Sequence, residues 1–477
     1  MKKSYTDSFF DVGSKYGFLP NNHPLTSLPN RYNSLQRLLD NMPVKLSDGS
    51  NGYLAIPNKI ENEVERLPNY IDLVKKESEI LIIQALYRAY CFLTSAYTLE
   101  LSYQEFVKTK KYGKARQILP KQVAQPFVCV AEKLDVYPWL DYHYAYSLGN
   151  YRFLDKSKGF HWSNLDQCVK FSGTSDESGF IMNHVDINQH SPKLVESVLE
   201  SLKAIKDNDQ EKLNENLKQN FHSMVFVNDR RKDMWVASRW KHYNDFRIFI
   251  MGIKGNNEIF DDGLVYQGVW DEPKQYRGQT GAQDNIIPME DIFSGVINFY
   301  PDNQLTKYLL DLRKYRPKCI QNFFVDLKQD IDSIHGGSIF NFLKSSQNSV
   351  GMCYLLAIVE EIYKFRNGHW QFVQKYIMSN TKYAKATGGT PIISWIPNQI
   401  KSVLNFIEVI IHELQSMDKD FDNKQNEFFI NSLNTYKSKK KLLDKQLIVV
   451  SDANYNPGKV FELNKKFKLE DSNFEKK

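Results

Sequence analysis

The 477-residue sequence contains few cysteines, and they lie far apart along the chain. No two of them form a Cys-x-x-Cys pair and their number is odd, so neither a disulfide framework nor a thiolate zinc site is expected. We therefore expect the protein to reside in a reducing compartment. The five residues are Cys91, Cys129, Cys168, Cys319 and Cys353.

The sequence also lacks a recognisable targeting segment and a convincing membrane span. Lys2 and Lys3 are followed by polar residues rather than by the apolar run of a signal peptide. The longest apolar stretch, residues 81–101, is interrupted by Arg88 and several polar side chains, which makes it too polar to cross a bilayer. These absences predict a soluble, cytoplasmic protein that does not bind membranes.

An excess of charge of one sign is missing from most of the chain. The sequence has 62 Lys and Arg against 56 Asp and Glu, which gives a net charge of +6. Residues 437–477 contain 11 Lys and 6 acidic residues and so contribute +5, which leaves +1 for residues 1–436. A body this close to neutrality gives no electrostatic reason to expect nucleic-acid binding. We interpret the five lysines within residues 437–445 as part of a solvated helix or tail, and residues 437–477 as a basic C-terminal tail.

No series of alternating apolar and polar residues joined by Asn-Gly or Asp-Gly turns is found, so a β-sheet protein is not expected. Apolar residues instead recur every three or four positions over long segments, which predicts an all-α fold. The chain is longer than a single core usually allows. A stretch rich in Gly, Ser and Asp at 171–180 predicts a linker between a smaller helical domain with an extended arm, residues 1–170, and a larger one, residues 171–436.

The common catalytic motifs HExxH, GxSxG, GxGxxG and the Walker lysine loop are missing. His369 nevertheless stands out, because it belongs to an otherwise apolar helical stripe. Such a histidine is either a core residue satisfied by a hydrogen bond or the axial ligand of a flat apolar cofactor such as haem. In the second case Arg366, three residues earlier on nearly the same face, would bind a haem propionate. The stripe comprises positions 355, 358, 362, 365, 369, 372 and 376.

Arg247 is the second residue that points to chemistry. It lies in the apolar segment Asp245–Ile250, where a guanidinium is costly unless an anion is near. The anion is either a structural carboxylate, such as Asp245 or Glu258, or the carboxylate of a substrate bound in bidentate fashion. The sequence leaves both interpretations open.

Five segments, in the same order, resemble the indoleamine 2,3-dioxygenase family. The likeness covers residues 80–397, about two-thirds of the chain. Any one of these segments is a weak signal, but their common order is specific. The segments are Ile118–Phe127, Phe246–Lys274, Leu312–Pro317, His369–Ile377 and Ala386–Thr390.

The resemblance implies a two-domain, all-helical haem enzyme in which the smaller N-terminal domain caps the larger, haem-binding one. The family uses ferrous haem and O2 to cleave the C2–C3 bond of an indole, converting L-tryptophan to N-formylkynurenine in tryptophan catabolism by the kynurenine pathway. We therefore expect haem b as the cofactor, and a small indole substrate and O2 as partners. We also expect no nucleic-acid partner, and a monomer or weak homo-oligomer.

The resemblance also implies how the cofactor would be held. His369 corresponds to the proximal ligand of the haem iron. Arg366 corresponds to the residue that contacts a propionate, and Asp291 to the acidic partner of that arginine. Thr280 and Gly281 fall beside the cofactor.

For the substrate, the resemblance assigns Arg247 to the arginine that binds the carboxylate and supports catalysis. It assigns Thr387, Gly388 and Gly389 to a loop that closes over the bound amino acid. Two glycines allow such a loop to close without a backbone penalty.

Several positions around the expected substrate differ from the mammalian enzymes. His184 replaces a pocket serine and is reminiscent of the distal histidine of tryptophan 2,3-dioxygenases. It either hydrogen-bonds the indole N–H and takes part in catalysis, or is a polar edge residue at a helix start. His242 and Tyr243 replace two phenylalanines, whereas Tyr142 is retained. The other expected substrate contacts are Phe180 and Thr280.

A more polar pocket leaves three functions to consider. The leading hypothesis is a haem dioxygenase acting on L-tryptophan. The second is the same chemistry on a substituted indole or tryptophan in a secondary-metabolite pathway. The third is a non-catalytic haem-binding or sensing protein, against which the retention of Arg247 and of the Thr387 loop argues.

Overall fold

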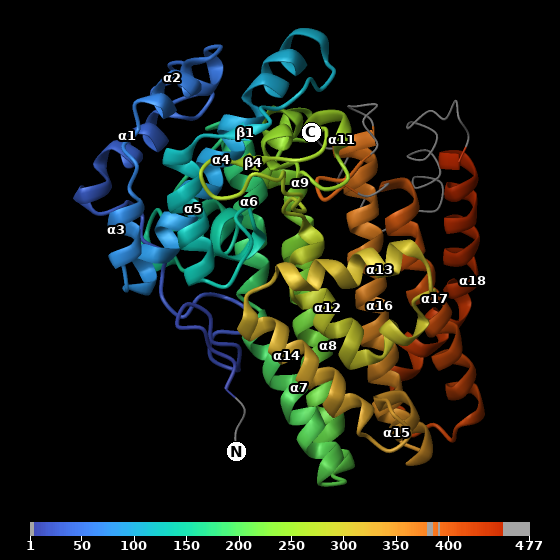
Figure 1. Cartoon of the computed structure of the whole chain (residues 1–477). Coiled ribbons are helices and arrows are strands. Elements are labelled where there is room, and N and C mark those ends of the chain that lie inside the picture. The colour runs from blue at the N-terminus through green and yellow to red at the C-terminus, as the bar shows by residue number, and fades with distance from the viewer. Residues whose placement is uncertain (1–3, 379–384, 390–391, 452–477) are drawn as a thin grey trace.

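The computed structural model describes residues 4–378, 385–389 and 392–451 (Figure 1). Helices make up most of this part of the chain, which confirms the predicted all-α class. The strands described are four short segments in two pairs. β1 (Ile118–Leu119) runs parallel to β4 (Val265–Tyr266), and β2 (Tyr151–Phe153) runs antiparallel to β3 (Leu165–Gln167).

The N-terminal part of the chain is built around one long helix, α4 (Ile80–Thr109). By length and composition α4 could cross a membrane, but 89% of its most apolar window is buried inside the fold, as in a core helix. Most of its residues are buried, including the polar Gln84, Arg88 and Glu100, so the helix has neighbours on most sides. Those neighbours include α5 (Lys121–Lys133) and the π-helical turn Tyr142–Tyr146. The other helices here are α1 (Asn33–Asn41), α2 (Lys59–Glu65) and α3 (Ile71–Lys76).

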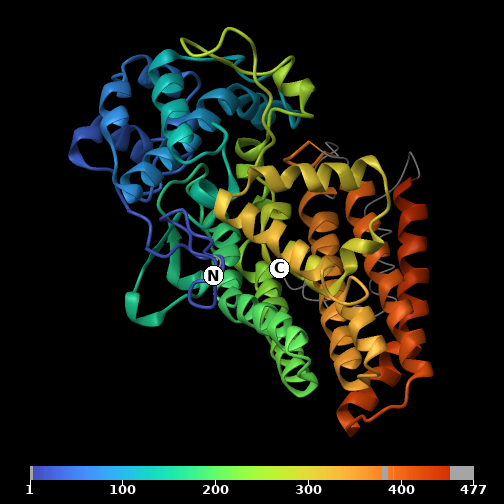
Figure 2. The ribbon, with the colours of Figure 1, turned by 60° about the horizontal axis from the view of Figure 1, so that its bottom comes forward.

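The C-terminal part contains a row of long helices that run side by side (Figures 1 and 2). α7 packs on α8, α8 on α16, α16 on α17, and α17 on α18, so α16 lies in the middle of the row. The bounds are α7 (Ser191–Lys206), α8 (Gln210–Lys232), α16 (Ser349–Phe372), α17 (Ile392–Ser416) and α18 (Asn423–Ser451).

The remaining α-helices are shorter. They are α6 (Ser175–Asn188), α9 (Met234–Ala237), α10 (Asn244–Arg247), α11 (Asn257–Phe260), α12 (Ile286–Ser294), α13 (Gln304–Asp311), α14 (Lys318–Asp332) and α15 (Ile339–Ser345). The predicted stripe on α16 is present, and its regular spacing continues into a π-helical turn, Val373–Met378.

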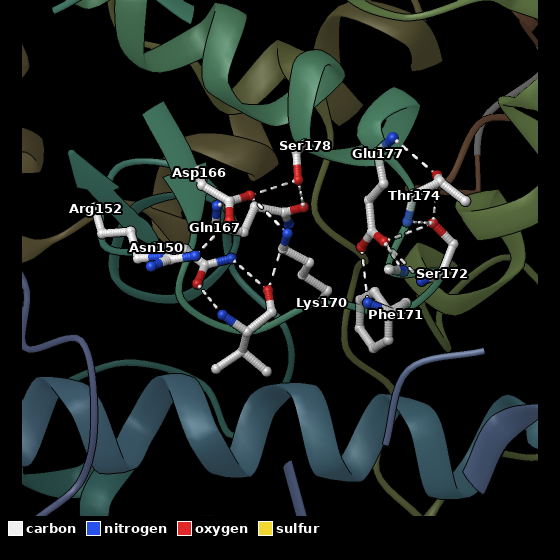
Figure 3. Close-up of polar contacts among 12 residues, drawn as sticks. Asn150, Arg152, Asp166, Gln167, Lys170, Phe171, Ser172, Thr174, Glu177 and Ser178 are labelled. Carbon is white, nitrogen blue, oxygen red and sulfur yellow. Dashed lines mark hydrogen bonds and ion pairs between the residues drawn. The ribbon is translucent and has the colours of Figure 1, made fainter. Parts of the chain in front are cut away.

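The segment 171–180, which the sequence suggested to be a linker, is a hydrogen-bonded corner (Figure 3). Thr174 caps the N-terminus of α6 by accepting a hydrogen bond from the Glu177 N–H. The buried Glu177 carboxylate accepts hydrogen bonds from the N–H groups of Phe171, Ser172 and Gly173, and from the Ser172 hydroxyl. The division of the chain at residue 170 stays a prediction, but the corner fixes where α6 begins.

The basic segment after residue 436 is not a tail over its first part, because α18 continues to Ser451. Two of its lysines pair with carboxylates on the neighbouring helices: Lys439 with Glu360 at 2.7 Å and Lys440 with Glu408 at 2.5 Å. Leu442 is buried. Lys439 and Lys440 therefore lie on the packed side of a helix, which the charge run alone did not reveal, whereas Lys437, Lys441 and Lys445 are exposed. Residues 452–477 lie outside the described part.

We expect Glu177→Leu to lower the free energy of unfolding by about 3 kcal/mol or more, because it leaves several buried donors without an acceptor. The measurement is chemical unfolding followed by circular dichroism. The matched control is Glu215→Ala on exposed α8 surface, which should change the free energy by no more than about 0.5 kcal/mol. Equal, small losses in the two variants would show that the corner is not held by the carboxylate.

Candidate functional site

Two cavities adjoin each other at helix α16, and Phe365 and His369 line both. The first, which we call the α6 cavity, extends from α16 to α6, α8 and the segment 279–284. The second, the α12 cavity, extends to α12 and to the 3-10 turn Leu312–Tyr315. The α6 cavity is mostly apolar; among its walls are Phe180, Ile187, Met234, Tyr243, Leu312, Phe372, Val373, Tyr376 and Ile377.

His369 lies in the last turn of α16 and faces the junction of the two cavities. Neither nitrogen of its ring has a hydrogen-bond partner among the residues that the structure describes. Burial lowers the pKa of His369 to about 4, and the proximity of His184, Arg231 and Arg366 adds to this shift. The imidazole is therefore neutral at physiological pH and keeps a lone pair for a metal. The hydrogen bond that marks an ordinary core histidine is not found in the described part of the chain.

The α12 cavity has a positively charged wall. Arg366 donates to the Asp291 carboxylate at 2.5 Å and to the Tyr300 hydroxyl at 2.9 Å, and the Tyr300 hydroxyl also donates to Asp291. The structure thus brings together the predicted pair of Arg366 and Asp291. Arg313 and Arg316 line the same cavity. Three guanidinium groups against two lining carboxylates, those of Asp284 and Asp291, leave an excess of positive charge that suits a ligand with acidic groups.

Sequence reasoning assigned no role to Arg313 or Arg316. Burial lowers the pKa of Arg316 to about 9, with the nearby Arg313 as the second cause. Arg316 donates to Asn285 and to the carbonyl groups of Ala282 and Asp284, so it supports the segment between the cavities. The signal in the sequence is the basic run Leu312–Pro317, which contains both arginines.

His184 lies in the middle of α6, not at a helix start, and lines the α6 cavity. Burial lowers its pKa. Its Nδ1 is 3.4 Å from the Tyr142 hydroxyl, which donates to Asp284 at 2.9 Å. The Phe180 ring packs edge-on against the His184 ring. The structure therefore brings Phe180 and His184 into the wall and places Tyr142 directly behind them.

Tyr243 and His242 are adjacent in sequence but point to different places. Tyr243 lines the α6 cavity with its ring against that of Phe180, and burial raises its pKa to about 12. His242 is a half-exposed surface residue whose Nδ1 lies 3.0 Å from the Asp245 carboxylate. The prediction that His242 contacts the substrate is not supported, because consecutive residues of a helical turn do not share a face.

The predicted loop closes one side of the α6 cavity. Thr387 lines the cavity, and its hydroxyl donates to the Gln279 carbonyl at 2.8 Å. The Gly388 carbonyl accepts a hydrogen bond from Tyr308. Gly389 has φ +92°, and an added Cβ would lie 2.3 Å from the Lys254 carbonyl oxygen, so only glycine fits there. The two glycines shape the loop without lining the cavity, and Thr390 lies outside the described residues.

Gly281 lies at the junction of the two cavities, with Thr280 next to it in the sequence. Thr280 lines the α6 cavity and caps the short 3-10 helix Gly281–Gln283. Gly281 lines both cavities. An added Cβ at Gly281 would sit 3.6 Å from Cε1 of His184, which is van der Waals contact, so the His184 ring lies directly beside this glycine.

Arg247 is fully buried behind Tyr243 rather than in the wall of a cavity. Its guanidinium donates to the Tyr112 hydroxyl at 3.0 Å and to the Lys385 carbonyl at 2.6 Å. Glu258, one of the two structural partners considered from the sequence, pairs with Lys385 instead. No carboxylate among the described residues pairs with Arg247. Its partners are neutral oxygens, so its charge is not balanced locally.

The described residues contain no group of three or more His, Cys, Asp and Glu side chains that could hold a metal ion. A metal at His369 would therefore have to bring most of its own ligands, as the iron of a porphyrin does. The flat apolar walls beside His369 and the guanidinium groups of the α12 cavity fit the apolar ring and the acidic edge of haem.

Comparisons with known proteins identify the family of the chain. A family model described as indoleamine 2,3-dioxygenase matches residues 6–429. The chain is 24% identical over 407 residues to indoleamine 2,3-dioxygenase 1 of Rattus norvegicus, covering 81% of this chain and 92% of that protein. It is 25% identical over 391 residues to indoleamine 2,3-dioxygenase 2 of Homo sapiens, covering 80% and 86%. It is 22% identical over 382 residues to 6-hydroxytryptophan 2,3-dioxygenase of Fusarium equiseti, covering 77% and 84%.

In the metal-free protein we expect His369 to take up its proton at about pH 4, well below the ordinary 6.5 for histidine. Above that pH the ring stays neutral and can bind a metal; below it, the proton occupies the lone pair. An NMR titration of the histidine ring protons measures this pKa, and His369→Gln identifies the resonance. A midpoint near 6.5 would mean that the ring is solvated and does not face a closed cavity.

Proposed function

Because the chain belongs to the indoleamine 2,3-dioxygenase family and is thus a haem-dependent dioxygenase, we propose that it cleaves the C2–C3 bond of L-tryptophan with O2, giving N-formylkynurenine. The observation that carries this choice of substrate is Arg247. A buried guanidinium without a carboxylate partner is costly, and a ligand carboxylate would balance its charge. A zwitterionic amino acid with an apolar aromatic side chain fits the nearby α6 cavity.

The side chains around the cavity junction fit haem b. His369 would be the protein ligand of the iron, since its neutral ring has no described hydrogen-bond partner. Arg366 and Arg313 would meet the propionates, with Asp291 orienting Arg366. Gly281 leaves room at the junction. When bound, haem supplies the reaction with O2, for which protein side chains have no suitable chemistry.

The protein's own contribution would be to orient the substrate and exclude water. Arg247 would exchange its Lys385 carbonyl partner for the substrate carboxylate. The aromatic rings of Phe180 and Tyr243 would hold the indole. Thr387, fixed to the Gln279 carbonyl, would keep the cavity closed during the reaction.

A substituted indole is the second candidate substrate, and a specific observation favours it. The α6 cavity has polar side chains next to its aromatic wall, namely those of Asn183, His184, Gln279, Thr280 and Asp284. Such groups can accept a hydrogen bond from a ring substituent or donate one to it. One of the similar proteins is a 6-hydroxytryptophan 2,3-dioxygenase, so the family includes a member named for a hydroxylated substrate.

The pathway, the location in the cell and the assembly state remain proposals. We place the chain in tryptophan catabolism by the kynurenine pathway, in the cytoplasm, as a monomer or weak homo-oligomer. All five cysteines are free thiols, which is compatible with a reducing compartment.

The test is anaerobic reduction of the haem-loaded protein, followed by addition of O2 and L-tryptophan and detection of N-formylkynurenine. We expect Arg247→Ala to raise KM by about 10- to 100-fold, the loss of one charge-assisted contact, and Arg247→Lys to recover part of it. The matched control is Arg152→Ala, which removes a half-exposed partner of Asp166 far from the cavity wall and should leave KM unchanged.

No product from L-tryptophan with fully loaded haem would refute the proposed function. Faster turnover of a ring-substituted indole than of L-tryptophan would favour the second candidate. Two results together would identify a non-catalytic haem protein. The wild type would bind haem but form no product, and Arg247→Ala would leave the ligand affinity unchanged.

A further inference from the structure

We propose that Asp284 and Tyr142 hold the His184 ring in the form that carries its hydrogen on Nδ1. This leaves the lone pair of Nε2 directed at the α6 cavity, so that the site selects a ligand with an N–H donor at that point. The inference rests on the proposed function, because it takes that ligand to be an indole. It adds two positioning residues: Tyr142 contacts His184, and Asp284 acts on His184 through Tyr142.

Asp284 is fixed as an acceptor by three donors. Its Oδ2 accepts hydrogen bonds from the Tyr142 hydroxyl at 2.9 Å and from the Asn188 side-chain amide at 2.8 Å. Its Oδ1 accepts one from the Ile286 N–H at 2.9 Å. The carboxylate is buried, and an ionised carboxylate can only accept. The hydrogen of the Tyr142 hydroxyl is therefore committed to Asp284.

Because its hydrogen is bonded to Asp284, the Tyr142 hydroxyl can only accept a hydrogen bond from His184. The Tyr142 side chain is fully buried, and burial together with Asp284 raises its pKa well above the ordinary value, so the hydroxyl keeps its hydrogen. With that hydrogen on Asp284, the Tyr142 oxygen can offer only a lone pair to His184 Nδ1, 3.4 Å away. A favourable contact then requires the hydrogen on Nδ1. Because a neutral imidazole carries one hydrogen, Nε2 has none.

The position of the His184 ring allows a ligand in the cavity to reach Nε2. His184 lines the α6 cavity, and its Cε1, which lies between the two nitrogens, faces Gly281 across the junction. Nε2 has no hydrogen-bond partner among the residues that the structure describes. An acceptor without a donor in a mostly apolar cavity raises the free energy of the protein, and a hydrogen bond from a ligand N–H lowers it. An N-methylated indole would instead place a methyl group against the lone pair.

The first experiment needs no substrate. Nitrogen-15 NMR of histidine-labelled protein, as purified and in its ferrous carbon monoxide form, reports which ring nitrogen of His184 carries the hydrogen; His184→Gln assigns the signals. We expect the hydrogen on Nδ1 in the wild type. In Asp284→Ala the Tyr142 hydroxyl is free to donate to Nδ1, so the hydrogen should move to Nε2. A hydrogen on Nε2 in the wild type would overturn the proposal.

The second experiment compares kcat/KM for L-tryptophan and N1-methyl-L-tryptophan, with dissociation constants from spectroscopic titration as an independent measure. We expect the wild type to prefer L-tryptophan by about 10-fold or more. The preference should fall toward equality in Tyr142→Phe and in His184→Ala, and the double variant should fall no further, since the two residues act through one contact. The matched control is Tyr144→Phe, which removes a hydroxyl bonded to Asp7 in the same helical turn and should keep the wild-type preference.

The outcomes separate this proposal from the proposed function. If the wild type turns over L-tryptophan and His184→Ala loses the preference while Tyr142→Phe and Asp284→Ala keep it, the positioning role is refuted and the dioxygenase function stands. If L-tryptophan is not turned over at all, the proposed function fails. The NMR measurement still decides which tautomer of His184 the contacts with Tyr142 and Asp284 stabilise.

Discussion

The rest of the site depends on one neutral imidazole, that of His369. It has no described protein partner, and a rigid helix directs it at the junction of two cavities. His369 keeps its lone pair because α16 lies in the middle of the helical row and burial disfavours the charged ring. The next residue, Trp370, donates to Gln446 on α18, and Arg366 one turn earlier donates to Asp291 on α12. Contacts to two other helices therefore limit rotation of α16 about its own axis, and the direction of the imidazole is fixed before any ligand binds.

The charges around the cavities are arranged for acidic groups. At one end three guanidinium groups, those of Arg313, Arg316 and Arg366, line the cavity together with two carboxylates, those of Asp284 and Asp291. At the other, Arg247 has only neutral oxygens for partners. Burying unbalanced cations lowers the stability of the protein unless a ligand supplies the anions. The same arrangement that is unfavourable in the empty protein would favour haem at one end and an amino-acid carboxylate at the other.

Periodicity predicted the elements and faces of this site better than the contacts of its residues. The stripe through His369 correctly placed Phe365, Phe372 and Tyr376 on one wall, because a helical period fixes which residues share a face. Single positions in short turns were less predictable: His242 points away from the cavity although Tyr243 beside it points in. The acceptor of Arg247 is a backbone carbonyl 138 residues away, which no side-chain pattern reveals. The corner at 171–180 has the composition of a linker but is ordered by one buried carboxylate, that of Glu177.

Resonance Raman spectroscopy of the ferrous protein tests the central claim most directly. The account predicts an iron–imidazole stretching band in the wild type that disappears in His369→Gly and returns when free imidazole is supplied to the vacated space. A band that persists in His369→Gly, or bound haem that shows no such band in the wild type, would contradict it.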